Sequence, residues 1–318
     1  MYLGIEIGGT KLQLGIGAGD GRIRMLWRGA VDPSGGGEGI RRQIQAAWPE
    51  LLRSAGLHRS QLQAVGIGFG GPVDDATRTV MTSHQIAGWD GFPLADWLSH
   101  ELGVPAYLGN DADVAGLAEA TFGAGRGVSP VFYVTVGSGI GGGLIIDGRI
   151  FRGVGRGAAE IGHLRWRDAD GRIDIIEHFA SGWGMEAEAR RHGRAWTARQ
   201  IGELADHDPL ARAILDHAIR ALAEGLCQVI ALICPRRIVI GGGVSLMGEE
   251  RWFAPLRRAV AERVFRPFAG LTDIVPASLG EEVVVHGALA LARQRHAEAS
   301  PASPASSASP KAPDPANT

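Results

Sequence analysis

Apolar runs separated by glycine-rich turns recur along this chain. The runs Tyr2–Ile7 and Leu12–Gly17 flank the turn Gly8-Gly9-Thr10-Lys11. A strand, a tight glycine turn and a second strand are typical of a β-hairpin. A similar pattern, VFYVTVGSGIGGGLII, covers residues 131–146. Because each hairpin opens one half of the chain, the pattern predicts two related domains.

The remaining apolar positions predict alternating helices and strands. A spacing of three to four residues predicts helices over residues 40–55, 185–194, 197–204, 209–233, 252–265 and 283–298, and one that begins at Ala112. Short apolar runs predict strands over residues 62–68, 104–108, 237–240 and 273–276, with residues 20–31 continuing the first sheet. Pro49 is a candidate break in the first helix, and SGGGEG at residues 34–39 predicts a flexible loop. Strand, helix and strand in that order favour parallel crossovers, so we expect an α/β fold.

The stretch VPAYLGNDAD, Val104–Asp113, places polar side chains at the end of a buried strand. Ligands of open α/β folds bind beyond the carboxyl ends of the strands. Asn110 and Asp111 are therefore in a position to act on a ligand. The segment alone also allows a second interpretation, in which Asp111 or Asp113 only caps the following helix.

The glycine turns are candidate phosphate sites, because glycines let backbone N–H groups approach a phosphate closely. Thr10 adds a hydroxyl and Lys11 a charge to the first turn, and Ser138 adds a hydroxyl to the second. The two hairpins could hold one polyphosphate from both sides, although an ordinary tight hairpin remains an alternative. Glu6 lies inside an apolar run, where an unpaired carboxylate would be costly, so it should face a metal ion, a cation or water. A third loop, Gly241–Gly243, follows a long helix and a strand and could form a slot for an adenine ring.

Two further polar groups precede and follow residues 164–176. Glu160 and His163 are three residues apart and would share one face if this segment is helical, and Glu177 follows. Glutamate can accept hydrogen bonds from vicinal hydroxyls, and a neutral histidine can both donate and accept. The alternatives are surface ion pairs for the glutamates and a structural role for the histidine.

Composition and charge exclude several classes of partner. The net charge of the 318 residues is −2, without the basic excess that would indicate nucleic acid or a block of like charge that would indicate a membrane surface. No apolar run reaches ~18 residues, so we expect no membrane span, and without signal-peptide features we expect a cytoplasmic protein. Cys227 and Cys234 lie in an apolar helical stretch and should be inert thiols. The Ala/Ser/Pro tail, residues 299–318, is predicted to be disordered.

Taken together, the motifs resemble those of the ROK family (repressors, open reading frames and kinases) of sugar kinases. The resemblance runs from Leu3 to Ala292 through GIEIGGTK, GIGFGGPVD, GNDAD, TVGSGIGGG, AEIGH, EHFASG and IVIGGGVS. It implies an actin-like ATPase (ribonuclease H-like) fold, in which two α/β domains face a cleft. We therefore expect a small domain over residues 1–111, completed by the helix 283–298, and a large domain over residues 112–282.

The resemblance also implies roles for matching residues in the ATP-dependent phosphorylation of a hexose hydroxyl, with glucose as the best guess. Asp111 matches the catalytic base, and Glu6 would meet Mg²⁺ through water. The residues that match sugar ligands are Gly71, Asn110, Glu160, His163 and Glu177. Those that match ATP ligands are Gly8, Gly9, Thr10, Lys11, Gly137, Ser138, Gly139, Gly241, Gly242 and Gly243. The family also implies an oligomer, for which we expect a homodimer.

The chain departs from the family pattern at two places. The first turn usually carries aspartate where this chain has Glu6, which keeps the charge and adds a methylene. Many relatives hold a structural zinc with one histidine and three cysteines, but the interval LRWRDADGRIDII, residues 164–176, contains no cysteine. We therefore predict no zinc, and expect Trp166 and Ile173–Ile176 to hold this segment instead.

Two other functions remain as alternatives. A transcriptional repressor of the family would carry a winged helix-turn-helix before the first turn, for which Gly8 leaves no room. A catalytically inactive sugar sensor would keep the sugar site but lose phosphotransfer. The motifs do not distinguish glucose from mannose, fructose, N-acetylglucosamine or N-acetylmannosamine, and polyphosphate remains an alternative phosphoryl donor.

Overall fold

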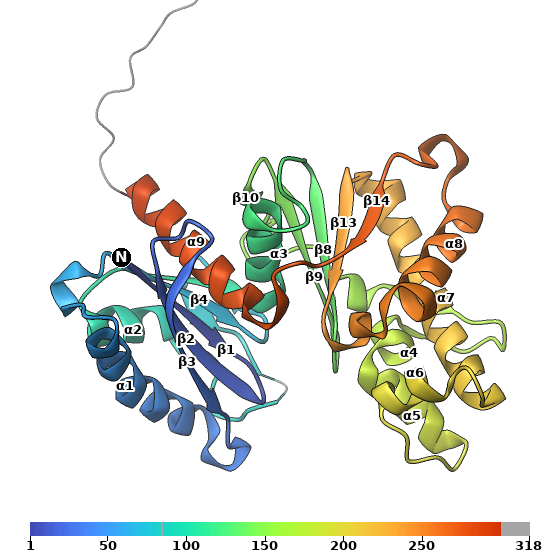
Figure 1. The fold of residues 1–318 in the computed structure, drawn as a ribbon, viewed down its shortest axis with the longest axis horizontal. Coiled ribbons are helices and arrows are strands. Elements are labelled where there is room, and N and C mark those ends of the chain that lie inside the picture. The colour runs from blue at the N-terminus through green and yellow to red at the C-terminus, as the bar shows by residue number, and fades with distance from the viewer. Residues whose placement is uncertain (84, 300–318) are drawn as a thin grey trace, which may run out of the picture.

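A five-stranded sheet forms the N-terminal half of the fold in the computed structural model, which describes residues 1–83 and 85–299 (Figure 1). Its strands lie in the order β3-β2-β1-β4-β7. Their bounds are β1 Tyr2–Ile7, β2 Lys11–Gly17, β3 Ile23–Ala30, β4 Ala64–Phe69 and β7 Ala106–Asn110. The first three strands are antiparallel, and β4 and β7 run parallel to β1. The predicted tail from residue 300 onward lies outside the described residues.

The second sheet repeats this layout. Its strands lie in the order β10-β9-β8-β13-β14. Their bounds are β8 Val131–Val136, β9 Ile140–Ile146, β10 Arg149–Ile150, β13 Arg237–Gly241 and β14 Asp273–Pro276. Again three antiparallel strands, β10, β9 and β8, are followed by β13 and β14, which run parallel to β8. The likeness of the two hairpins in the sequence therefore extends to the two sheets.

The helices cover these sheets in two groups. Helices α1 and α2 pack with the first sheet, and α4–α8 with the second (Figure 1). The bounds are α1 Gly36–Ser54, α2 Leu94–Leu102, α4 Glu177–Ala180, α5 Gly182–Arg191, α6 Ala198–Leu204, α7 Pro209–Ile233 and α8 Ala254–Arg263. Two short hairpins add β5 Val73–Asp74 with β6 Thr79–Val80, and β11 Arg165–Arg167 with β12 Ile173–Ile175. Within the described ranges, no helix has the length and apolarity needed to cross a membrane.

Helices α3 and α9 join the two halves. Helix α9, Val283–Ala299, returns to pack on β1 and β4 of the first sheet, as the sequence predicts. Helix α3, Asp111–Phe122, packs against α9 on one side and against β8 and β9 of the second sheet on the other. The close approach of α9 requires glycine: a Cβ on Gly287 would lie 1.9 Å from the carbonyl oxygen of Val114 in α3. The proposed domain boundary at residue 111 thus falls at the start of a helix that contacts both sheets.

The start and the middle of α1 differ from the prediction. The helix begins at Gly36 inside the segment expected to be a flexible loop, because the Gly37 N–H donates to the Ala87 carbonyl at 2.8 Å and so fixes this end. It also continues through Pro49 without a break. Proline removes the hydrogen bond to the carbonyl four residues earlier, but Gln45 is exposed, so water can satisfy that carbonyl.

Substitution of Gly287 tests the contact between α3 and α9. We expect Gly287→Ala to lower the free energy of unfolding by ~1–3 kcal/mol, because the added methyl group overpacks this contact. The matched control is Gly39→Ala in α1, where no atom lies within 4 Å of the added Cβ. Since alanine is the better helix former, the control should gain up to ~1 kcal/mol. Chemical denaturation measures both; an unchanged Gly287→Ala would contradict the packing described above.

Candidate functional site

Asn110 organises the junction between β7 and α3. Its Oδ1 accepts hydrogen bonds from the N–H groups of Ala112 at 2.9 Å and Asp113 at 3.4 Å, so Asn110 takes the N-cap position. Its Nδ2 donates to the Gly71 carbonyl at 3.0 Å. Asp111 and Asp113 therefore belong to the first turn of the helix and do not cap it. Asp111 Oδ1 accepts from the Ala112 N–H at 2.8 Å.

Desolvation changes the acidity of the carboxyl groups in this first turn. It raises the pKa of Asp111 to about 6, and the charge of Glu160 raises it further, while Lys11 opposes the shift. Burial likewise raises the pKa of Asp113 to about 7, against the opposing charge of Arg152. Asp111 is thus a carboxylate at neutral pH that gains a proton more readily than a fully solvated aspartate.

The first glycine turn carries a charged pair. Glu6 is 6% exposed on β1, and its Oε1 lies 3.0 Å from the Nζ of Lys11. Lys11 also donates to the Glu281 carbonyl at 3.1 Å. Burial raises the pKa of Glu6 to about 7, and Lys11 opposes this shift. Glu6 therefore faces a cation, as expected, and its Oε2 is buried without a hydrogen-bond partner.

The second glycine turn is held from two sides. The carbonyls of Gly137 and Ser138 accept hydrogen bonds from the N–H groups of Gly182 at 2.7 Å and Trp183 at 3.2 Å, at the start of α5. In a trans peptide the C=O and the following N–H point in opposite directions, so the N–H groups of Ser138 and Gly139 point away from these donors. Glu177 Oε2 accepts from the Ile140 N–H at 2.7 Å.

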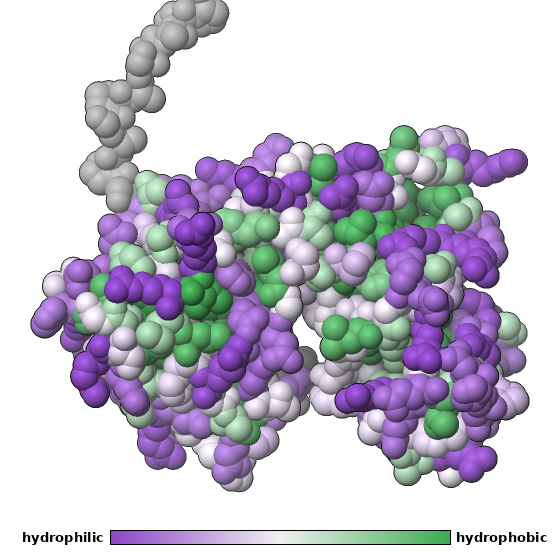
Figure 2. Space-filling model, viewed as in Figure 1, coloured by the Kyte–Doolittle hydropathy of each residue, from purple (hydrophilic) through white to green (hydrophobic). Residues whose placement is uncertain are grey.

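Two cavities that share lining residues bring together most of the predicted ATP ligands, whereas Gly8, Gly9 and Gly139 line neither of them. One, of about 460 Å³, is lined by Glu6, Lys11, Asp111 and Gly241–Gly243, among others. The other, of about 870 Å³, has Thr10, Lys11, Gly137, Ser138 and Gly243 in its lining. Figure 2 shows the surface hollowed between the two halves of the molecule. Because Lys11 and Gly243 line both cavities, the two glycine turns and the triglycine loop surround one continuous region.

Several cavity residues were not predicted from the sequence. Tyr133 and Thr135 of β8 line the smaller cavity. Trp183 and Leu246 line the larger one and are 55% and 84% exposed. Large apolar side chains exposed in a cavity are what a bound ligand would cover. The sequence offered no signal for them, since helix and loop formation explained both segments.

Three of the five predicted sugar ligands, Glu160, His163 and Glu177, are close enough for their charges to interact. Glu160 precedes a 3₁₀ turn, Ile161–His163, so Glu160 and His163 do not share a face of an α-helix as considered from their spacing. Desolvation raises the pKa of Glu160, the charge of Glu177 adds to this and His163 opposes it. The three side chains are therefore electrostatic neighbours. They line neither of the two cavities, whereas Asp111 lines the smaller one.

The segment between these residues is the β11–β12 hairpin. Trp166 packs edge-on against Phe179, with ring centroids 5.1 Å apart, and lies 5.3 Å from His217 on α7. The guanidinium of Arg172 lies 4.4 Å from the centroid of Phe179. Trp166 thus holds the hairpin as expected. No group of three or more His, Cys, Asp or Glu side chains suited to a metal ion occurs in residues 1–83 and 85–299.

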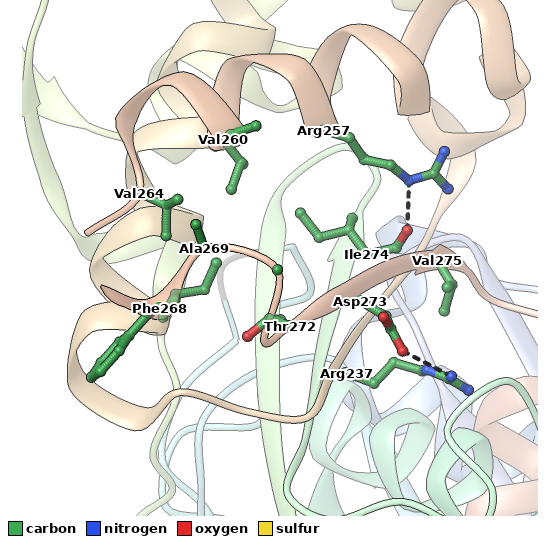
Figure 3. Close-up of a pocket in the computed structure, with 13 residues that line it drawn as sticks. Arg237, Arg257, Val260, Val264, Phe268, Ala269, Thr272, Asp273, Ile274 and Val275 are labelled. Carbon is green, nitrogen blue, oxygen red and sulfur yellow. Dashed lines mark hydrogen bonds and ion pairs between the residues drawn. The ribbon is translucent and has the colours of Figure 1, made fainter. Parts of the chain in front are cut away.

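A further pocket, of about 510 Å³, lies between α8 and the edge strand β14 (Figure 3). Its polar groups are already paired: Arg257 Nε donates to the Ile274 carbonyl at 2.7 Å, and Arg237 lies 3.0 Å from Asp273. Arg257 thereby covers the open side of an edge strand, which would otherwise be free to pair with another chain. The lining contains neither of the two phosphate turns.

Comparison with known proteins identifies the family. The ROK family model matches residues 2–295. A glucokinase of Halalkalibacterium halodurans is 30% identical over 318 aligned positions, which cover 92% of this chain and 95% of the relative. The crystal structure of the ROK hexokinase from Thermus thermophilus has a TM-score of 0.81 and 29% identity, covering 93% of this chain and 99% of that one.

A second crystal structure is that of a ROK glucokinase from Streptomyces griseus in complex with glucose and AMPPNP. It has a TM-score of 0.74 and 31% identity, and the match covers 92% of this chain and 99% of that one. The likeness to these structures confirms the predicted actin-like ATPase fold with its two α/β sheets. The chain therefore belongs to the ROK family, the family that its sequence motifs predict.

Proposed function

We propose that this protein transfers the γ-phosphoryl group of ATP to a hydroxyl group of a hexose. One observation carries the proposal: Asp111 and Lys11 line the same cavity, and Lys11 also lines the neighbouring cavity beside the second glycine turn. This arrangement supports the proposal, because a carboxylate that can accept a proton lies next to a region lined by groups suited to a polyphosphate. The resemblance to a hexokinase and two glucokinases of the family agrees with it.

Asp111 acts as the general base in this proposal. Its carboxylate takes the proton of the sugar hydroxyl, the hydroxyl oxygen bonds to the γ-phosphorus, and the bond from that phosphorus to the β–γ bridging oxygen breaks to release ADP. The base is most useful when its pKa lies just below the working pH, which the value of about 6 satisfies. Most of the remaining catalysis in phosphoryl transfer comes from positioning and charge neutralisation.

The sugar would be bound by Gly71, Asn110, Glu160, His163 and Glu177. Asn110 has one amide N–H committed to the Gly71 carbonyl, which leaves its second N–H for a hydroxyl. Glu177 has one oxygen committed to the Ile140 N–H, which leaves the other for a hydroxyl. Glucose is the substrate we propose, since it is the sugar that the Streptomyces griseus relative binds.

ATP would be bound by the two glycine turns, residues 8–11 and 137–139, with the adenosine beside Gly241–Gly243. The outward N–H groups of Ser138 and Gly139 and the Nζ of Lys11 are suited to phosphate oxygens. The unpartnered Oε2 of Glu6 fits a hydrated Mg²⁺, which prefers oxygen ligands and retains several waters. When bound, Mg²⁺ would neutralise phosphate charge, while Lys11 and the backbone amides hold the phosphates in place.

We also propose that residues 164–176 need no zinc. The cluster of Trp166, Phe179 and His217 supports this proposal, because it packs the hairpin against α4 and α7. Ion pairs add to this packing: Asp168 lies 3.5 Å from His217, and Asp174 lies 2.8 Å from His178. Helix α4 begins at Glu177, so the same packing orients a proposed sugar ligand.

Substitution of Asp111 tests the kinase proposal. We expect the wild type to form ADP from Mg-ATP with one sugar of a panel of hexoses and amino sugars, and Asp111→Asn to lose 10²-fold or more of kcat, as removal of a positioned base commonly does. A coupled ADP assay measures this. Sugar binding without any turnover by the wild type would favour the sensor function instead.

The pH dependence tests the role of the same carboxylate. A base must be deprotonated to act, so kcat/KM for the hexose should be constant above pH ~7 and fall about tenfold per pH unit below about 6, the pKa of Asp111. Initial rates between pH 5 and 8.5, at constant ionic strength, measure the profile. An inflection near pH 4, the pKa of an ordinary aspartate, would show that burial does not raise the pKa of Asp111.

Replacement of Trp166 tests the hairpin. We expect Trp166→Ala to lower the melting temperature by roughly 5 °C and to raise KM for the hexose more than KM for ATP. Trp48→Ala is the matched control, since Trp48 packs on the first core, away from both cavities; it should be destabilised with both KM values unchanged. A zinc chelator should leave the melting temperature of the wild type unchanged, and release of one zinc per chain would contradict the proposal.

A further inference from the structure

Arg152 reaches from the second sheet toward the strand end that carries Asn110 and Asp111. It follows β10 and is only 16% exposed, which is unusual for an arginine outside a binding site. One of its terminal nitrogens lies 3.5 Å from the Leu108 carbonyl of β7. The other lies 3.8 Å from the position of a Cβ added to Gly109. The guanidinium therefore rests on the backbone two residues before the proposed catalytic base.

The same side chain pairs with one carboxyl group and is close enough to a second to influence its charge. Asp75, just after β5, has its Oδ1 3.6 Å from Arg152 Nη1. Asp113, in the first turn of α3, is 3% exposed, and its Oδ1 has no hydrogen-bond partner. Burial raises the pKa of Asp113, and the charge of Arg152 is the strongest influence that opposes this shift. Arg152 thus links Asp75 to the end of β7, directly before the start of α3.

Two other arginines pair with Asp74 or Asp75 without a hydrogen bond to the backbone of β7, and Arg295 also lies over the Tyr107 ring, 5.9 Å from its centroid. Arg295 of α9 lies 3.6 Å from Asp75 Oδ2 and is 39% exposed. Arg156 lies 3.2 Å from Asp74 and is 68% exposed. Exposed pairs of this kind contribute little. Replacing either arginine therefore removes an ion pair with Asp74 or Asp75 but leaves the hydrogen bonds at the junction of β7 and α3 unchanged. The two variants serve as controls.

We propose that Arg152 is a positioning residue for the phosphotransfer: it fixes the end of β7 and the first turn of α3 against the loop that leads from Gly71 to Asp75. The inference rests on the proposed function. Gly71 accepts the hydrogen bond of Asn110, so the loop, Asn110 and Asp111 form one unit that Arg152 holds from the other half of the molecule. Misplacement of a reacting group by about 1 Å can cost 10²-fold in rate, which makes such support kinetically important.

Kinetics of Arg152→Gln test this inference. We expect kcat to fall by roughly 10- to 100-fold, with KM for ATP within about threefold of the wild type, since ATP is held by other elements. Arg152→Lys should recover part of the loss, because it restores the charge but not the planar guanidinium. Arg295→Gln and Arg156→Gln should keep kcat within about threefold.

Hydrogen exchange provides a readout that does not depend on activity. The N–H groups of Ala112 and Asp113 should exchange faster in Arg152→Gln than in the wild type, and at the wild-type rate in Arg295→Gln. A kcat for Arg152→Gln within threefold of the wild type, or an equal loss in Arg295→Gln, would overturn the inference. If the wild type phosphorylates no sugar, the proposed function fails, and the exchange rates alone decide whether Arg152 positions this segment.

Discussion

The side-chain amide of Asn110 is the contact on which the arrangement of the site depends. Its oxygen caps α3, and its nitrogen holds the Gly71 carbonyl at the end of a different strand. Because one planar group makes both contacts, the helix start and the glycine loop cannot move independently. Asp111 is the next residue, so the position of its carboxylate is set by Asn110, which is held by these two contacts.

Around this contact the protein buries more negative charge than its local cations neutralise. Desolvation raises the pKa values of Glu6, Asp111 and Asp113 to about 7, 6 and 7. Lys11 lies against Glu6, and the charge of Arg152 opposes the raised pKa of Asp113. Raised carboxyl pKa values destabilise the folded state as pH increases from the unfolded values near 4 to the folded ones. Such a cost is typical of sites in which charge is held ready for a ligand.

Local sequence signals predicted those parts of the fold that local physics determines. Helix α7 has the predicted bounds because Asp208 caps it and Pro209 suits its first turn, and both hairpins follow from their glycine turns. The sequence did not predict the helix over residues 36–39, because its start is fixed by a hydrogen bond to Ala87, some fifty residues away. It also did not predict that the helix continues through Pro49, because this depends on the exposure of Gln45. Arg152 and Trp183 were missed for a related reason: their partners come from distant segments, and no spacing along the chain indicates those contacts.

Glu177 connects the two sides of the proposed reaction. One of its oxygens accepts the Ile140 N–H directly after the second glycine turn, and in the proposed reaction the other would bind a sugar hydroxyl. A side chain at residue 139 would collide with this carboxylate, since an added Cβ would lie 2.6 Å from Oε2, so the contact requires glycine at that position. The hairpin that carries Trp166 orients α4 and thus Glu177. In the proposed reaction, a single carboxylate would therefore couple sugar binding to the geometry of the second glycine turn. The packing of the aromatic cluster around Trp166 would then affect both.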